Sequence, residues 1–148
     1  MRDWTEVGFS SIYYLLKKLE RDGYVEGQLD EAARGPARKI YRATPNGQQA
    51  LRAGVLEALS TPQRCYPALQ LGLSHLPGIP IAEAIQALGQ YRDGLEERLA
   101  HVRQRWQSQQ PLPLFIEAMF EHSTMLIQAE LSWVDGFMKR MEAQRVQD

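Results

Sequence analysis

The pattern of residues 10–45 indicates an amphipathic helix, a glycine that ends it and then two short extended stretches. Few folds are compatible with this order of elements. The apolar side chains before Gly23 recur at helical spacing and fall on one face: Ile12, Leu15, Leu16 and Leu19. Gly23 supplies the left-handed backbone position that commonly ends a helix. Residues 24–29 and 39–43 then read as two strands, with the turn-prone, basic segment 34–38 between them. This order predicts a winged helix-turn-helix, whose helix enters the major groove and whose wing reaches the neighbouring backbone or minor groove.

The face of the helix opposite the apolar stripe carries hydroxyl groups, phenols and cations, which bind phosphates and base edges. Seventeen basic and eighteen acidic residues give a net charge near zero, so net charge does not indicate nucleic-acid binding. A DNA-binding surface would instead be a local basic patch. Residues 34–42 fit it, because they hold four cations and no acid. A merely solvated helix face is the competing interpretation. The predicted DNA contacts, from helix 10–22 and wing 31–39, are Ser10, Ser11, Tyr13, Tyr14, Lys17, Lys18, Arg21, Arg34, Arg38 and Lys39.

Two motifs in this region also carry a family resemblance. Residues 12–25, IYYLLKKLERDGYV, and residues 35–47, GPARKIYRATPNG, resemble the PadR family of bacterial transcriptional regulators. The shared pattern is a tyrosine, a leucine-cation-leucine run, an acidic-glycine turn into a strand, and a basic Y-x-x-T-P-x-G strand exit. The resemblance covers about the first third of the chain. It implies a dimeric DNA-binding regulator and a backbone phosphate contact for Tyr13.

The segment ahead of the predicted recognition helix is short for this fold. A winged helix-turn-helix normally has two earlier helices, which cover the apolar face of the recognition helix, whereas nine residues precede Ser10 here. Trp4 and Val7 would shield part of that face, and Leu51 and Val55 of a later helix another part. We therefore expect a module that lacks its usual first helices and leaves apolar surface exposed. Loosened packing and weak DNA binding would follow.

A helix is expected directly after the wing, because Thr44 is a natural N-cap and Pro45 suits the first helical position. The polar, proline-containing segment 60–62 ends this helix and marks a boundary. The chain thus divides into a DNA-binding module, residues 1–60, and a dimerisation domain, residues 61–148. A shorter helix at about 66–76 opens the second domain.

Two long amphipathic helices are expected at 80–107 and 114–145, joined by a proline-containing link, and should fold back as an antiparallel, coiled-coil-like hairpin. Arg92 interrupts the apolar seam of the first. The apolar stripe of the second is predicted to be Phe115, Met119, His122, Leu126, Ala129, Trp133, Phe137 and Met141. One hairpin buries only part of such faces, which predicts a homodimer. Its predicted contacts are Ile85, Leu88, Leu95, Leu99, Val102, Leu126, Trp133 and Phe137.

The residues give little support to catalysis or metal binding. No two of the three histidines have the spacing of a helical metal pair, and the sequence lacks a nucleophile elbow, a phosphate-binding loop and a dinucleotide motif. We therefore expect neither an enzyme, nor a cofactor, nor a metal site. The single cysteine and the lack of a long apolar run favour a soluble cytoplasmic protein without a membrane partner.

The predicted fold is mainly α: an N-terminally incomplete winged helix-turn-helix with a small two-stranded wing, followed by an α-helical hairpin dimerisation arm. The predicted function is a PadR-like transcriptional regulator, a repressor, that binds a double-stranded operator as a homodimer. The alternative is a truncated dimerisation or interaction module that does not bind DNA on its own. The resemblance also implies a possible small aromatic effector, since some members of that family bind flat aromatic molecules near the dimer interface. The aromatic and methionine-rich arm could line such a pocket, although ordinary helix packing explains the same composition.

Overall fold

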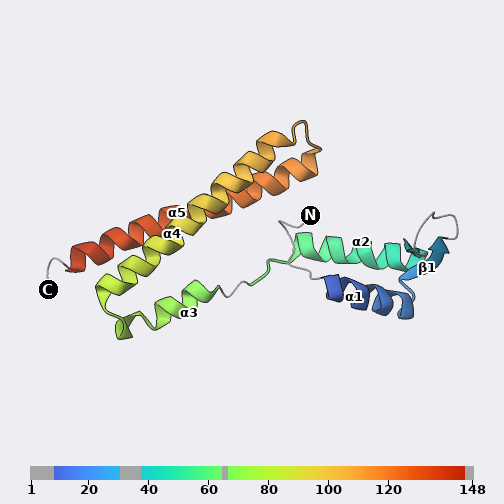
Figure 1. Ribbon diagram of the computed structural model, residues 1–148, viewed down its shortest axis with the longest axis horizontal. Helices are drawn as coiled ribbons and strands as arrows, with labels where there is room; N and C mark the ends of the chain where they lie inside the picture. Colours follow the sequence, from blue (N-terminus) through green and yellow to red (C-terminus); the bar gives the residue numbers. More distant parts are fainter. Residues whose placement is uncertain (1–8, 31–37, 65–66, 146–148) are drawn as a thin grey trace. The chain divides into compact units, whose positions relative to one another are not determined.

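The computed structural model describes residues 9–30, 38–64 and 67–145, and the chain forms two compact units, Met1–Cys65 and Tyr66–Asp148 (Figure 1). The first unit holds helix α1 (Phe9–Arg21), strands β1 (Val25–Asp30) and β2 (Arg38–Ala43), and helix α2 (Pro45–Ser60). The predicted boundary after residue 60 coincides with the end of α2. The described residues are mainly helical and include a two-stranded sheet, which confirms the predicted fold class.

Local signals end α1 and start the wing where the sequence predicts. Gly23 has a positive φ of 74°. The amide of Gly23 donates to the Glu20 carbonyl, and the amide of Tyr24 donates to the Leu19 carbonyl. These bonds give hydrogen-bond donors to carbonyl groups in the last turn of α1. β1 and β2 then pair as an antiparallel hairpin, with Val25 opposite Ala43 and Asp30 opposite Arg38. Both predicted strands are therefore confirmed, each within one residue of its predicted ends.

The T-P-x-G motif fastens α2 to the turn after α1. The Thr44 hydroxyl accepts from the Gly47 amide at 3.0 Å, as an N-cap should, and donates to the Gly23 carbonyl at 2.7 Å. The Thr44 amide donates to the Tyr24 carbonyl. A Cβ at Gly47 would lie 2.0 Å from that same carbonyl oxygen, so the close approach requires glycine.

The described part of the first unit contains no fully buried side chain. On α1, the predicted inward stripe is only half covered: Leu16 is half-buried, while Ile12, Leu15 and Leu19 remain exposed. Leu51, Val55 and Leu59 of α2 are exposed as well. The expectation of uncovered apolar surface is thus confirmed for the described residues, whereas Trp4 and Val7 lie outside them.

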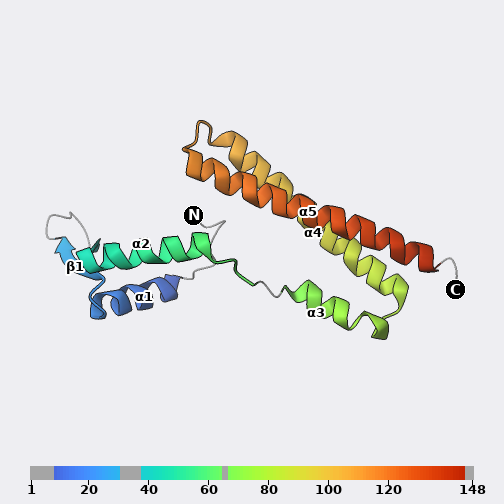
Figure 2. The same cartoon turned by 180° about the vertical axis from the view of Figure 1, so that it is seen from behind.

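The second unit is a long helical hairpin with a short helix before it. Helix α3 (Ala68–Ser74) and a 3-10 turn, η1 (Leu76–Gly78), precede α4 (Ile81–Ser108), and α5 (Leu114–Arg145) returns alongside α4 (Figures 1 and 2). The predicted long helices begin and end within one residue of these bounds. Among the helices of the described ranges, none is both long and apolar enough to cross a membrane.

Two apolar clusters form the core of the hairpin. One joins Leu95 and Leu99 of α4 to Ile127 and Val134 of α5, and Val134 is fully buried. The other joins Ala84, Leu88 and Met141 near the open end, where Leu69 of α3 and Leu76 of η1 pack against it.

The face of α5 that packs on α4 differs from the predicted stripe. Of the eight predicted residues only Met141 is buried, while Phe137 packs against the second cluster. The core side chains of α5 are Phe120, Thr124, Ile127, Leu131, Val134, Met138 and Met141. At about 100° per residue this set is centred roughly 120° away from the predicted stripe. α5 therefore has two apolar faces: the inner one packs on α4, and the predicted stripe lies largely on the outer one, where the predicted dimer contacts Leu126 and Trp133 also lie.

Candidate nucleic-acid interface

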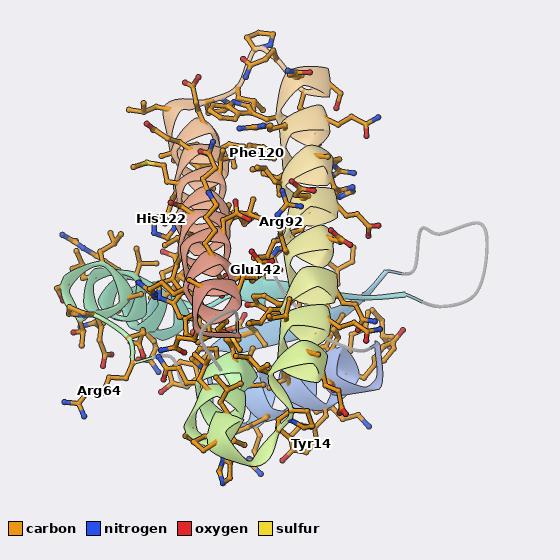
Figure 3. All side chains as sticks on the ribbon, turned by 90° about the vertical axis from the view of Figure 1, so that its left-hand side faces the viewer. Tyr14, Arg64, Arg92, Phe120, His122 and Glu142 are labelled. Carbon is orange, nitrogen blue, oxygen red and sulfur yellow. The ribbon has the colours of Figure 1, made fainter. Side chains whose placement is uncertain are left out.

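Helix α1 presents two tyrosines on its exposed side. Tyr13 and Tyr14 are 69% and 70% exposed, and Ser11 in the same turn is exposed too. A phenol offers both a hydrogen-bonding hydroxyl and an aromatic edge, so these side chains are suited to contacts with DNA phosphates or bases. Figure 3 shows Tyr14 pointing outward from α1.

Three cations follow in the next turns of α1. Lys17 and Lys18 are exposed. Arg21 Nε bonds Asp22 Oδ1 at 3.0 Å, yet the Arg21 side chain remains 74% exposed. Lys18 and Arg21 lie in the last helical turn, where cations also complement the helix dipole. The outer face of α1 therefore combines hydroxyls and cations in the pattern that the sequence predicts.

The wing lysine has a partner on α1. Lys39 Nζ bonds Glu20 Oε2 at 2.7 Å and lies 5.1 Å from the centre of the Tyr41 ring. The hydrogen bond to Glu20 raises the pKa of Lys39. Gly27, on the neighbouring strand, leaves the room that this pair occupies, since a Cβ there would meet Lys39 Cε. The ion pair ties β2 to α1 and partly neutralises one predicted DNA contact.

The side chains of the remaining predicted DNA contacts lie outside the part of the chain that the structure describes. Arg34 lies in the segment 31–37, and the side chains of Ser10 and Arg38 are likewise not described. The role of all ten residues in DNA binding stays a prediction. Glu20 and Lys39 are 19 residues apart in the chain, and no local sequence pattern indicates their pairing.

A second candidate surface lies on α5. Its exposed apolar side chains on one helix face, here named the outer stripe, are Phe115, Met119, Leu126 and Trp133. Trp133 stacks on Phe137 with ring centres 5.2 Å apart. Figure 3 shows His122, on the same helix face, directed away from α4. This apolar face remains accessible after the hairpin has formed, which is typical of a protein–protein contact.

The structure divides the eight predicted dimer contacts. Leu88, Leu95 and Leu99 are buried inside the hairpin of their own chain. Ile85, Val102 and Phe137 are half-buried, whereas Leu126 and Trp133 are exposed. The three buried leucines thus stabilise the hairpin itself, and a dimer role stays a prediction for the whole set.

Polar groups on α4 and α5 cross-link the hairpin. Tyr91 donates to Glu130 Oε1 at 2.5 Å, and burial together with this hydrogen bond raises the pKa of Tyr91 to about 12. Arg92 bonds Asp135 at 2.7 Å and Glu96 at 2.9 Å. Figure 3 shows Arg92 reaching from α4 toward α5. Arg92 therefore contributes to the seam that the sequence analysis expected it to interrupt.

The aromatic side chains of the arm are used partly in packing. Phe120 is buried and stacks on Trp106, with ring centres 6.1 Å apart. The guanidinium of Arg140 lies 5.6 Å from the centre of the Phe137 ring. Packing therefore accounts for Trp106 and Phe120, while Trp133 retains an exposed surface. In the described part of the chain, no group of three or more His, Cys, Asp or Glu side chains is placed to hold a metal ion.

Comparisons with known proteins give one family match and several similar folds. Residues 1–53 match the model of the transcriptional regulator PadR-like family. The structure is similar to Bacillus subtilis PadR in complex with operator DNA, with a TM-score of 0.78 and 16% identity over 94% of this chain and 82% of that chain. No curated protein sequence matches this chain.

Two further solved structures show the same fold. Bacillus subtilis PadR in complex with p-coumaric acid has a TM-score of 0.75 and 16% identity, over 94% of this chain and 81% of that chain. The Vibrio cholerae virulence activator AphA has a TM-score of 0.70 and 15% identity, over 96% and 82% of the two chains. At these identities the likeness establishes the fold.

Proposed function

From the family match over residues 1–53 and from the fold, we propose that this chain is a PadR-like transcriptional regulator that binds operator DNA as a homodimer and represses transcription. The observation that carries the proposal is the exposed outer face of α1, with Tyr13, Tyr14, Lys17 and Lys18. A solved structure of the same fold is in complex with operator DNA, which supports the DNA partner.

In the proposed complex α1 lies in the major groove and the wing lies against the neighbouring backbone. Lys17, Lys18 and Arg21 neutralise phosphates, and each neutralised phosphate releases counterions and makes affinity salt-dependent. The hydroxyls of Tyr13 and Tyr14 bind phosphates or base edges beside them. The Lys39–Glu20 pair holds the wing strand against α1, so that helix and wing approach DNA as one piece.

The proposed dimer forms through the outer stripe of α5. Leu126 and Trp133 provide apolar area that the hairpin leaves accessible. A two-fold dimer would hold two copies of α1 at a fixed distance, so the operator half-sites are expected about 34–36 Å apart or at a multiple of that spacing.

Repression is the proposed sign of regulation. Steric exclusion of the polymerase by a bound dimer requires only DNA binding, whereas activation requires an additional contact. A virulence activator shares this fold, so the fold alone does not distinguish a repressor from an activator. The position of the operator within the promoter would determine which of the two the chain is. A reporter assay with the chain's own upstream promoter would show lower expression in its presence, and higher expression would contradict repression.

Fluorescence anisotropy with that promoter region tests DNA binding. Lys17→Ala is expected to lower affinity and to reduce the log–log salt slope by roughly one unit, because one phosphate contact is lost. Lys139→Ala, which removes the same charge from α5, is the matched control and should leave both values unchanged. Equal effects of the two variants would show that the α1 cations act only through net charge.

An interaction module without DNA binding is the second candidate function. The observation that favours it is the half-exposed apolar stripe of α1, which indicates a loosely packed first unit. Under this alternative, the chain forms dimers but does not retard its promoter DNA at any salt concentration. DNA retardation with the expected Lys17 dependence would exclude it.

A further inference from the structure

A cavity of about 430 Å³ opens where α3, η1 and the start of α4 meet. Its size suits one small organic molecule. Leu69 and Leu76 pack against the core beside it, so that core supports the cavity wall. The lining side chains are almost all apolar. With one glycine and two alanine positions, the lining residues are Leu69, Gly72, Leu73, Leu76, Ile79, Glu83, Ala84, Ala87, Leu88 and Tyr91.

The cavity lining has two polar side chains, Glu83 and Tyr91, and each can only accept a hydrogen bond from a ligand. Glu83 contributes a carboxylate, and the lining contains no lysine, arginine or histidine. The Tyr91 hydroxyl already donates its proton to Glu130, so the phenol oxygen keeps only its accepting capacity. A carboxylate ligand placed here would face Glu83 with like charge, whereas a cation would gain a charge-assisted hydrogen bond.

We propose that this cavity binds a small amphipathic cation, an amine carried on an apolar or aromatic body, as the effector of this regulator. The apolar body would lie among Leu69, Leu73 and Leu76, and the ammonium group would bond the Glu83 carboxylate at the rim. The proposal rests on the proposed regulatory function. It assigns a ligand charge opposite to that of p-coumaric acid, which the similar Bacillus subtilis PadR holds.

The position of the cavity also provides a route to regulation. α3 is the first helix after the junction between the two units at Cys65 and Tyr66. A ligand that binds α3 and α4 together would stabilise one arrangement of α3 and thereby bias the segment that connects the DNA-binding unit to the hairpin.

Calorimetric titration of the full chain with 4-phenylbutylamine and with 4-phenylbutyrate tests the assignment, since the two probes share one apolar body and differ in charge. The amine is expected to bind about tenfold more tightly, the usual effect of one hydrogen bond to a charged group. Glu83→Gln should remove that preference. Glu117→Gln, which changes the acid in the first turn of α5, is the matched control and should keep it.

Ala87→Phe fills the cavity from α4 and should abolish binding of the amine while leaving the helical circular dichroism unchanged. The proposal is overturned if neither probe binds at millimolar concentration, or if the acid binds as tightly as the amine. Binding that survives Ala87→Phe, or a preference that survives Glu83→Gln, would also overturn it. Because binding is measured without DNA, intact promoter binding beside any of these results would leave the proposed function standing.

Discussion

Among the described glycines of the first unit, Gly47 makes the closest approach to a backbone atom, the Tyr24 carbonyl oxygen. Gly47→Ala should lower the free energy of unfolding by about 2 kcal/mol. A Cβ 2.0 Å from that oxygen would push the start of α2 away from the turn that follows α1. Gly54→Ala in the same helix meets no atom within 4 Å and should raise stability by about 0.5 kcal/mol. Hydrogen exchange of the α2 amides measures the stability change in both variants. Similar changes in the two would contradict the proposed close contact between Gly47 and Tyr24.

Glu20 competes with DNA for the wing lysine. The carboxylate holds Lys39 Nζ at 2.7 Å, so Glu20→Gln should release the ammonium group to a phosphate and increase operator affinity. The log–log salt slope should become steeper by up to roughly one unit. Glu57→Gln, near the far end of α2, removes the same charge and is the control for net charge. If both variants change the slope equally, the pair has no specific role.

The hairpin of α4 and α5 depends on its inner face. Val134→Ala should lower the free energy of unfolding by about 2 kcal/mol, because it leaves a cavity at a fully buried position. Leu114→Ala removes a larger side chain from an 82% exposed position and should change stability by less than about 0.5 kcal/mol. Urea unfolding followed by circular dichroism compares the two. Equal losses would show that the inner face of α5 is assigned wrongly.

The Tyr91–Glu130 bond makes the hairpin sensitive to alkaline pH. The pKa of Tyr91 rises from its ordinary value of 10 to about 12 in the folded chain, so folding favours the protonated phenol. Its contribution to stability is present below pH 10 and is lost as the pH rises toward 12. Tyr91→Phe should therefore flatten the fall in urea midpoint across this range, whereas Tyr13→Phe on α1 should not. An unchanged pH profile in Tyr91→Phe would refute the linkage.

The association of two chains should depend on the outer stripe of α5. Leu126→Glu is expected to convert a dimer into a monomer, because it places a charge in an apolar contact, and to weaken binding to the full operator more than to a half-site. Leu114→Glu, at an exposed position off the stripe, should leave the dimer intact. Sedimentation velocity measures both. A monomeric parent chain at micromolar concentration would contradict the proposed assembly.

The ends of the elements could be read from neighbouring residues alone. Gly23 ends α1, and the Thr44 cap starts α2, because a cap or a positive φ involves groups only a few residues apart. The two long helices could be predicted within one residue for the same reason, since their periodicity and flanking prolines are local. The exposed cations and phenols of α1 likewise follow from helical spacing once the apolar side is recognised.

Partners distant along the chain depended on the tertiary structure. Arg92 finds Asp135 on α5, and Lys39 finds Glu20 on α1, over separations that no local pattern encodes. The cavity beside Glu83 exists because α3 turns back at η1 and its leucines pack on α4. Periodicity shows that α5 has apolar faces, but both faces repeat every three to four residues, so only packing against α4 selects Val134 for the core and leaves Leu126 outside.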